Sequence, residues 1–459
     1  MQHTTSSLQS LRTSSERLRV TTNSRCVRWI ATLTLLALAT LLTASSAIAA
    51  GTWSPAAPLA TARNSHTATL LANGKVLVVA GYGPIVWIAT AELYDPTSDA
   101  WTSAGAISAP RNAHSATLLP DGRVLVAGGA NNTTNNLATA DLYNPTTNTW
   151  SAAAPMAAVR SGHTATLLAN GKVLVAGGLG AAGLPIKTAE VYDPISNTWT
   201  PTGPMIKDYV ARAASRLANG KVLVMGGYNS GTGTPLAELY DAVTNTWTAA
   251  APMAAVRYGH TATLLGNGKV LAVGAFGQSN IKLRSTELYD SASNTWSLTG
   301  SLVTGRVTQS TSLLADGRVL VAGGEGDNST VLASAELYDP AIASWAATGA
   351  LAIARSYHTT TLLNNGKVLA VGGSFANGIV MASTELYTPG IAAAPNCNPD
   401  IDGDGAFLAT TDALILLRIG MGMNSSAVIA NISFPAGATR NTWPLIRDYL
   451  VMQCGFSLP

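Results

Sequence analysis

The chain has 459 residues, of which 47% are hydrophobic, only 11% are charged and 43 are glycine. This composition is typical of short strands joined by tight turns, and it argues against a disordered or mainly helical protein. The formal net charge is +3, but residues 1–49 hold five arginines and one acid, which leaves 22 basic and 23 acidic residues. Without a clustered basic surface to neutralise phosphates, we expect no nucleic-acid partner.

Residues 1–49 have the pattern of an export signal. The basic part ends at Arg28, an uncharged apolar run follows over residues 29–42, and Ala47-Ile48-Ala49 supplies the small residues of a cleavage site. We therefore expect a secreted, periplasmic or cell-surface protein. The alternative is an uncleaved anchor, because residues 29–50 carry no charge and are long enough to span a bilayer. Only in that case do we expect contact with a membrane.

A repeat fills the middle of the chain. Tryptophans recur every 48 or 49 residues, at Trp53, Trp101, Trp150, Trp199, Trp247, Trp296 and Trp345. Within one unit, residues 164–168 and 172–176 are β-prone runs joined by Asn170-Gly171, which favours a tight antiparallel hairpin. Alternation around Tyr192 predicts a third strand, and the tryptophan lies on a short fourth strand. Four strands per unit are typical of a propeller blade.

The double glycine Gly177-Gly178, followed by a tyrosine and then a tryptophan at set distances, resembles the Kelch repeat. The resemblance covers residues 52–389. It implies an all-β fold in which residues 50–389 form a seven-bladed β-propeller of four-stranded blades. The first tryptophan precedes every tyrosine strand, so we expect the strand at Trp53 to become the outer strand of the last blade. Such closure removes open sheet edges.

The polar residues of the repeat are interpreted as framework. Histidines occupy one place in five units, at His66, His114, His163, His260 and His358, and a ring would hold them too far apart to bind one metal ion. Arginines recur in the same way, at Arg63, Arg111, Arg160, Arg212, Arg257, Arg306 and Arg355. The alternative for the arginines is anion attraction at one mouth of the channel. The Arg-x-x-His element is interrupted at Ser215 and Gln309, and the double glycine at Ala80 and Ala275.

The loops between the second and third strands differ most between units. We expect them to share one face of the ring with the segments that join neighbouring blades. Variable loops on a rigid scaffold favour recognition, and aromatic side chains there suit contact with a protein or a glycan. The candidate binding residues are Tyr82, Trp87, Tyr209, Tyr228, Tyr258, Phe276, Tyr357 and Phe375. The alternative is ordinary sequence variation of the loops, with a few aromatic side chains buried to hold them in place.

Residues 397–459, after a linker over residues 390–396, are predicted to form a small helical module. Asp400, Asp402 and Asp404 are spaced as in the front half of an EF-hand-type calcium loop, and the segment is similar to a dockerin repeat. Asp412, the last acid, lies one residue beyond the position of the final ligand in such a loop. No second calcium loop follows, so docking to a cohesin is not expected. The alternative to Ca²⁺ binding is an acidic surface turn.

Two further features of this module follow from its sequence. Cys397 and Cys454 are the cysteines that remain after a cleaved leader, and in an exported protein such a pair predicts a disulfide. A helix is predicted from Thr442, with Pro444 in its first turn, to Met452.

Two functions are compatible with these patterns. We favour a non-catalytic, secreted and monomeric binding module; the alternative is an extracellular carbohydrate-active enzyme, such as a lyase, oxidase or glycosidase, at one mouth of the channel. Polar residues outside the repeat scatter over several blades, at Asp208, Lys282, Arg284, Glu325 and Asp327. Galactose oxidase, a copper enzyme on a Kelch propeller, needs a cysteine cross-linked to tyrosine, and this chain has no cysteine between Cys26 and Cys397.

Overall fold

The computed structural model describes residues 51–390, apart from residues 133, 134, 211 and 230, and further residues near the C-terminus: Ile415, Ile429, Thr439, Arg440 and residues 442–452. The predicted signal peptide, the linker beyond residue 390, the calcium ligands Asp400, Asp402, Asp404 and Asp412, and Cys397 and Cys454 lie outside these residues. The helix predicted near the C-terminus is present as α3 (Trp443–Met452).

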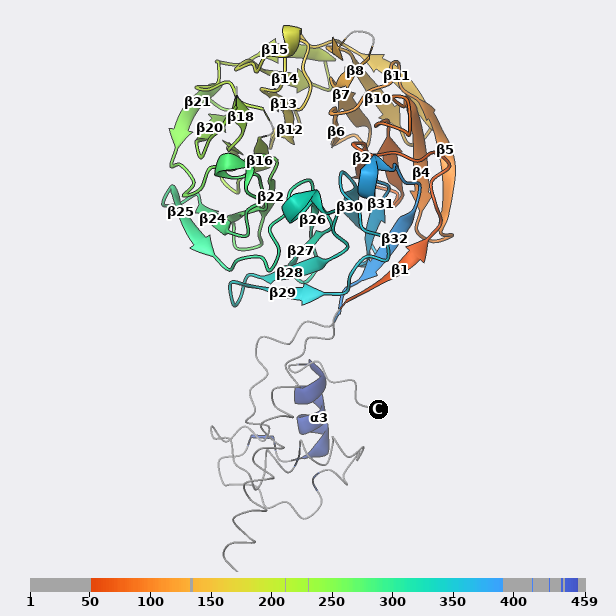
Figure 1. The fold of residues 1–459 in the computed structure, drawn as a ribbon, viewed down its shortest axis with the longest axis vertical. Helices are drawn as coiled ribbons and strands as arrows, with labels where there is room; N and C mark the ends of the chain where they lie inside the picture. Colours follow the sequence, from red (N-terminus) through yellow and green to blue (C-terminus); the bar gives the residue numbers. More distant parts are fainter. Residues whose placement is uncertain are drawn as a thin grey trace, which may run out of the picture. The chain divides into compact units, whose positions relative to one another are not determined.

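Seven four-stranded antiparallel sheets stand around a central axis as the blades of a propeller (Figure 1). Blade 1 contains β2 (Thr67–Leu70), β3 (Val76–Val79), β4 (Thr90–Asp95) and β5 (Ala100–Ala106). Blade 2 contains β6 (Ser115–Leu118), β7 (Val124–Ala127), β10 (Ala140–Asn144) and β11 (Thr149–Ala153). Blade 3 contains β12 (Thr164–Leu167), β13 (Val173–Ala176), β14 (Ala189–Asp193) and β15 (Thr198–Pro201). In each, the first strand lies innermost.

The remaining blades repeat this order. Blade 4 contains β16 (Ala213–Arg216), β17 (Val222–Met225), β20 (Ala237–Asp241) and β21 (Thr246–Ala250). Blade 5 contains β22 (Thr261–Leu264), β23 (Val270–Val273), β24 (Thr286–Asp290) and β25 (Thr295–Thr299). Blade 6 contains β26 (Ser310–Leu313), β27 (Val319–Ala322), β28 (Ala335–Asp339) and β29 (Ser344–Thr348). Blade 7 contains β30 (Thr359–Leu362), β31 (Val368–Val371), β32 (Thr384–Thr388) and β1 (Thr52–Ala56).

Short elements occupy the loops between the second and third strands. Blades 2 and 4 have small hairpins there, formed by β8 (Ala130–Asn131) with β9 (Asn135–Asn136), and by β18 (Tyr228–Asn229) with β19 (Thr232–Gly233). Blades 3, 5, 6 and 7 have 3-10 turns, namely η1 (Ala181–Gly183), η2 (Gln278–Asn280), η3 (Asp327–Ser329) and η4 (Ala376–Gly378). The loops therefore differ in conformation, while the four-strand order is the same in every blade.

The N-terminal strand closes the ring, as predicted. β1 pairs antiparallel with β32, with Trp53 opposite Tyr387, and so completes blade 7. The innermost strand of blade 1, β2, also lies against the innermost strand of blade 7, β30. β32 is therefore paired on both sides, and the ring is closed between blades 7 and 1.

The core consists of layers between neighbouring blades. The second strand of every blade is apolar and buried along its whole length, because it is covered by a blade on each side. The repeated tryptophan joins the layers: Trp150 packs on Tyr143 with 5.0 Å between ring centroids, and its indole N–H donates to the carbonyl oxygen of Ala104 in blade 1 at 2.7 Å. Both the apolar body and the polar tip of the side chain are thus satisfied.

Candidate functional site

The loops between the second and third strands share a face with the segments that precede the innermost strands, as predicted; we call this the loop face. Isolated bridges join the two sets, for example Asn64 to Tyr82 and Ser161 to Leu179. The double glycine makes this approach possible, because a Cβ on Gly178, whose φ is +93°, would lie 2.5 Å from the carbonyl oxygen of Ser161. The loop face is therefore a rigid platform with variable surface loops.

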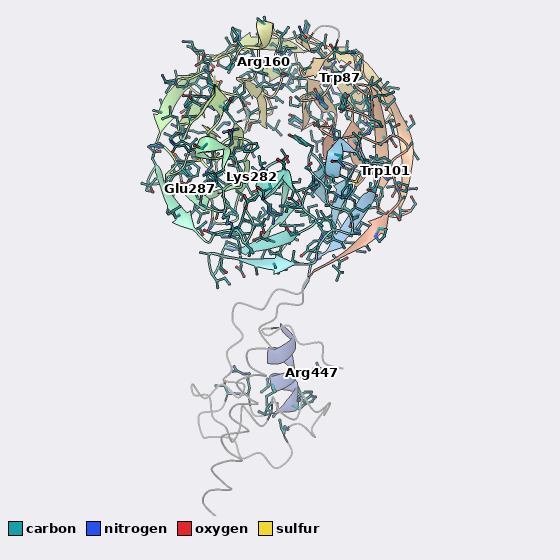
Figure 2. All side chains as sticks on the ribbon, in the orientation of Figure 1. Trp87, Trp101, Arg160, Lys282, Glu287 and Arg447 are labelled. Atoms are coloured by element: carbon teal, nitrogen blue, oxygen red, sulfur yellow. The ribbon has the colours of Figure 1, made fainter. Side chains whose placement is uncertain are left out.

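The repeated arginines belong to the framework. Arg160 is fully buried and lies 2.7 Å from the Glu190 carboxylate on β14, and it also donates to the carbonyl oxygens of Gly177 and Thr188. The same buried pair recurs in the other blades, as Arg63–Glu92, Arg111–Asp141, Arg212–Glu238, Arg257–Glu287, Arg306–Glu336 and Arg355–Glu385. Figure 2 shows Arg160 and Glu287, from two of these pairs, at separate places around the ring. No arginine of the set is available to an anion at the channel mouth.

The acidic partner of each pair has a second task that sequence reasoning missed. Glu190 accepts the backbone N–H groups of Ala157 and Ala158 at 2.7 and 3.3 Å, in the segment that enters blade 3. One carboxylate therefore fixes a guanidinium and an interblade segment together, and its remaining oxygen lone pairs are used inside the protein. These repeated acids of the third strands are structural.

Blade 4 corrects one part of the sequence alignment. The register of β16 on β17 places Arg212 at the histidine position and Tyr209 at the arginine position, so the alignment that put Ser215 with the histidines is wrong by three residues. The ion pair persists because both terminal nitrogens of Arg212 reach Glu238 at 3.2 Å. The Arg212 guanidinium also lies 5.9 Å from the centroid of the Tyr209 ring. The arginine side chain is long enough to reach the same carboxylate from the arginine position or from the histidine position.

The five histidines lie beside the innermost strands, and His66, His114, His260 and His358 are buried while His163 is half-buried. His163 shares a hydrogen bond of 2.9 Å with Ser115 of blade 2, and His66 and His114 make the same contact with a threonine of the preceding blade. Burial is the main cause that lowers the pKa of His114, His163, His260 and His358 to about 3, with the nearby arginines contributing. They are neutral packing residues at physiological pH.

Metal-binding geometry is not found in the part of the chain that the structure describes. There, no three His, Cys, Asp or Glu side chains gather as ligands for one ion. Each histidine instead belongs to a different blade, so the residues present do not match a copper site built on histidine ligands. Within the same described residues, no helix is long and apolar enough to cross a membrane.

The eight candidate aromatic residues divide into separate groups on the loop face. Tyr228, Tyr258 and Phe276 stack in series, with ring centroids 4.9 and 5.1 Å apart, and Lys282 lies over Phe276 at 5.6 Å. Tyr82 and Trp87 form an edge-to-face pair at 5.0 Å. These side chains and Tyr209 are half-buried, and they serve partly as anchors of their own loops. The eight residues therefore do not form one continuous surface.

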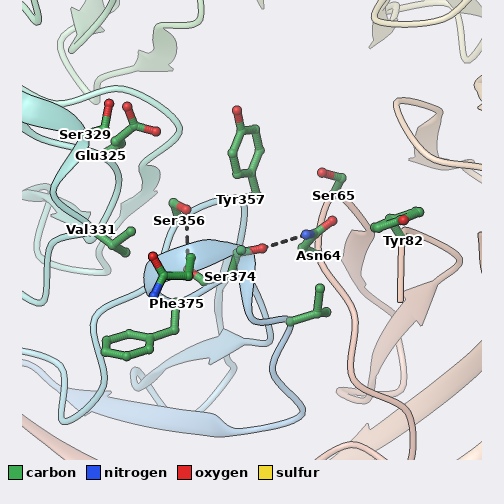
Figure 3. A pocket seen from close by; sticks show the side chains of 13 residues that line it. Asn64, Ser65, Tyr82, Glu325, Ser329, Val331, Ser356, Tyr357, Ser374 and Phe375 are labelled. Carbon is green, nitrogen blue, oxygen red and sulfur yellow. Dashed lines mark hydrogen bonds between the residues drawn. The ribbon is translucent and has the colours of Figure 1, made fainter. Parts of the chain in front are cut away.

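Three of the candidates, Tyr82, Tyr357 and Phe375, line one open pocket of about 470 Å³ where blades 6, 7 and 1 meet on the loop face. Tyr357 and Phe375 are the most exposed members of the candidate set, at 49% and 40%. The Tyr357 ring projects from its segment between Glu325 on one side and Ser65 on the other (Figure 3). Burial, and secondarily the Glu325 carboxylate, raises the pKa of the Tyr357 phenol, which therefore remains a hydrogen-bond donor.

Two charged pairs beside this pocket were not foreseen. Lys282 of blade 5 lies 3.0 Å from Glu325 of blade 6, with side-chain exposures of 9% and 24%, and Arg284 lies 3.9 Å from Asp327 across the same joint. The expectation that these polar residues scatter is wrong for these four, because they come from equivalent loops of adjacent blades. The sequence did contain one indication of this contact, because Lys282 occupies a position at which other blades have the apolar residues Pro185, Val331 and Val380.

Comparisons with known proteins agree with this architecture. A family model described as the KLHDC2/KLHL20/DRC7 Kelch-repeats domain matches residues 65–274. A solved fungal alcohol oxidase of the AA5 family, in complex with copper, is 19% identical over 74% of this chain and 76% of that chain, with a TM-score of 0.63. The structure of YjhT is 18% identical over 63% of this chain and 99% of that chain, with a TM-score of 0.52. A comparison with curated proteins found no match.

These findings support a β-propeller of the Kelch type. At 18% and 19% identity the two solved structures show the fold alone, since one propeller architecture carries many unrelated activities. The function has to be argued from the residues of the loop face.

Proposed function

We propose that this chain is an exported, non-catalytic binding module that holds a protein or carbohydrate partner on its loop face. The supporting observation is the place where the repeat is broken. The buried charges of the framework are paired within each blade, whereas Lys282, Glu325 and Tyr357 depart from their counterparts and lie in or beside one pocket. A rigid scaffold with unique residues on variable loops is suited to recognition.

A calcium-stabilised C-terminal module is the second part of the proposal, and it is supported by the sequence of residues 397–459. Asp400, Asp402, Asp404 and Asp412 would supply oxygen ligands, and a Cys397–Cys454 disulfide would close the module. A cation that binds the folded module raises its thermal midpoint. We expect Ca²⁺ to raise the midpoint of the full chain and the change Asp402→Asn to abolish that rise.

A second candidate function is a carbohydrate-active enzyme. The observation that favours it is the proximity of a carboxylate, an ammonium and a phenol at Glu325, Lys282 and Tyr357. Lys282 and Glu325 neutralise each other, however, and acid–base catalysis of glycoside cleavage needs two carboxyl groups that flank one bond. We therefore place this function second.

The test is a binding screen of the full chain against neutral and charged oligosaccharides and against extracellular proteins, with and without Ca²⁺. Saturable binding of either class, lost when loop-face residues are changed, supports the proposed function. Turnover of any saccharide would replace it with the enzymatic function. If neither class binds, the proposal fails.

A further inference from the structure

Building on the proposed function, we infer that the pocket between blades 6, 7 and 1 is a subsite for one neutral sugar residue. In this subsite Tyr357 is the stacking platform, and the Glu325 carboxylate, held by Lys282, is the acceptor for sugar hydroxyls. Three independent features of the pocket lead to this assignment.

The first feature is the size of Tyr357 at a position where other blades are small. Its counterparts, one step before the histidine position, are Ser65, Ala113, Gly162, Ala211, Gly259 and Thr308. Tyr357 has a φ of +53°, and Ser65, Ala113 and Thr308 have the same left-handed conformation at this position, so the conformation belongs to the repeat. The Tyr357 ring is half exposed, so core packing does not explain a large side chain here. An exposed aromatic ring at a position where the other blades have a small residue indicates a contact surface for a ligand.

The second feature is the polarity of the pocket wall. Glu325 occupies a position that is Leu179, Phe276 or Ser374 in other blades, and its Oε1 atom is fixed by Lys282 from blade 5. Because the two charges neutralise each other, the wall offers a strong hydrogen-bond acceptor without a net field. A hydroxyl donor gains from such an acceptor, whereas a carboxylate or ammonium group on the ligand gains no net attraction.

The third feature is a pre-organised polar floor. The Asn64 side chain donates to the Ser374 hydroxyl at 2.6 Å, and the Ser356 hydroxyl donates to the Ser374 carbonyl oxygen at 3.4 Å (Figure 3). These bonds join the loop between β31 and β32 to the segments that lead into blades 1 and 7. The pocket volume of about 470 Å³ lies within the range of small-molecule sites. A floor of hydroxyl and amide groups beside the exposed Tyr357 ring matches a sugar, which has one apolar face and a polar rim.

The chain itself supplies the variants for a test. Tyr357→Ser gives blade 7 the residue of blade 1, and the double change Lys282→Val with Glu325→Ser gives blades 5 and 6 residues that blade 7 carries at the same places. Each variant copies a side chain that the fold already tolerates, so we expect folding to be retained. Tyr357→Phe keeps the ring and is the conservative variant. Ile281→Thr copies Thr330 at an exposed loop tip outside the pocket and is the matched control.

Isothermal titration of the full chain with cellobiose, lactose and maltose, and with glucuronic acid and glucosamine, tests the assignment. We expect at least one neutral disaccharide to bind, with affinity weakened roughly tenfold by Tyr357→Ser and by the double change, and unchanged within about twofold by Tyr357→Phe and Ile281→Thr. Retention of binding by Tyr357→Ser overturns the inference. So does the absence of binding by every neutral disaccharide up to about 10 mM. If a protein partner alone is captured, the inference fails and the proposed function stands; if nothing is captured, both fail.

Discussion

The two faces of the ring use charge in different ways. The face opposite the loop face, which we call the turn face, carries the hairpin turns and repeats one exposed ion pair, as Lys75–Asp95, Lys172–Asp193, Lys221–Asp241 and Lys269–Asp290. The loop face has Lys282–Glu325, a pair that spans two blades and whose lysine is 9% exposed. A pair that recurs in each unit follows from copying the unit. A pair that crosses between two particular blades does not follow from copying the unit, and it marks a region where the repeat is broken.

The largest effect is expected from the framework that supports both faces. Glu190→Ala would leave the Arg160 guanidinium buried and unpaired, and we expect the free energy of unfolding to fall by about 3–5 kcal/mol. Urea denaturation measures this change. The double variant Arg160→Met with Glu190→Leu removes both charges and should lose clearly less stability than Glu190→Ala. If the single variant were as stable as the parent chain, the framework role of the pair would be wrong.

An intermediate effect is expected from acid. Burial lowers the pKa of His163 to about 3, whereas an unfolded histidine titrates near 6.5, so the unfolded chain binds more protons between these values and stability falls as the pH falls through this window. At pH 5 this amounts to roughly 2 kcal/mol for one such histidine relative to pH 7. His163→Gln, which copies Gln309 of blade 6, should reduce the acid sensitivity by that amount. Unfolding curves at pH 7 and pH 5 test this, and an unchanged difference between them would contradict it.

The smallest effect is expected on the turn face. Lys172 and Asp193 are 3.0 Å apart but well exposed to solvent, which screens their attraction. Lys172→Ala should therefore leave the urea midpoint unchanged within error at moderate ionic strength, and it should leave sugar binding unchanged as well. A clear loss of stability would show that the repeated pairs of this face belong to the framework after all.

The fold could be derived from the sequence because its determinants are periodic. The tryptophan spacing, the Asn-Gly turns and the double glycines fix four strands per unit, and the unmatched Trp53 predicts the closing strand, which β1 confirms. The alignment failed at Arg212 because it matched residue types, whereas the hydrogen-bond register is counted from the following hairpin. In irregular segments, counting from the nearest strand is the more reliable guide.

The candidate site was less predictable because its determinants are not periodic. Tyr357 and Glu325 were named from the sequence, but nothing in a single blade shows that Glu325 meets Lys282, since the contact depends on how two neighbouring loops curve toward each other. Most of the other aromatic candidates proved to be half-buried anchors, which an exposed-loop interpretation does not distinguish from contact residues. The residue types of the loops predicted a surface suited to binding, but the pocket could be located only from the packing of neighbouring blades.

The joint between β1 and β32 has a consequence for how copies of the chain interact during folding. Ser54 on β1 and Leu386 on β32 are 332 positions apart in the chain, so the last blade stays one strand short until the two ends meet. Until then β32 offers a free edge to any matching strand, including β1 of a second molecule. Refolding at high concentration should therefore yield domain-swapped oligomers, and dilution should favour the closed monomeric ring.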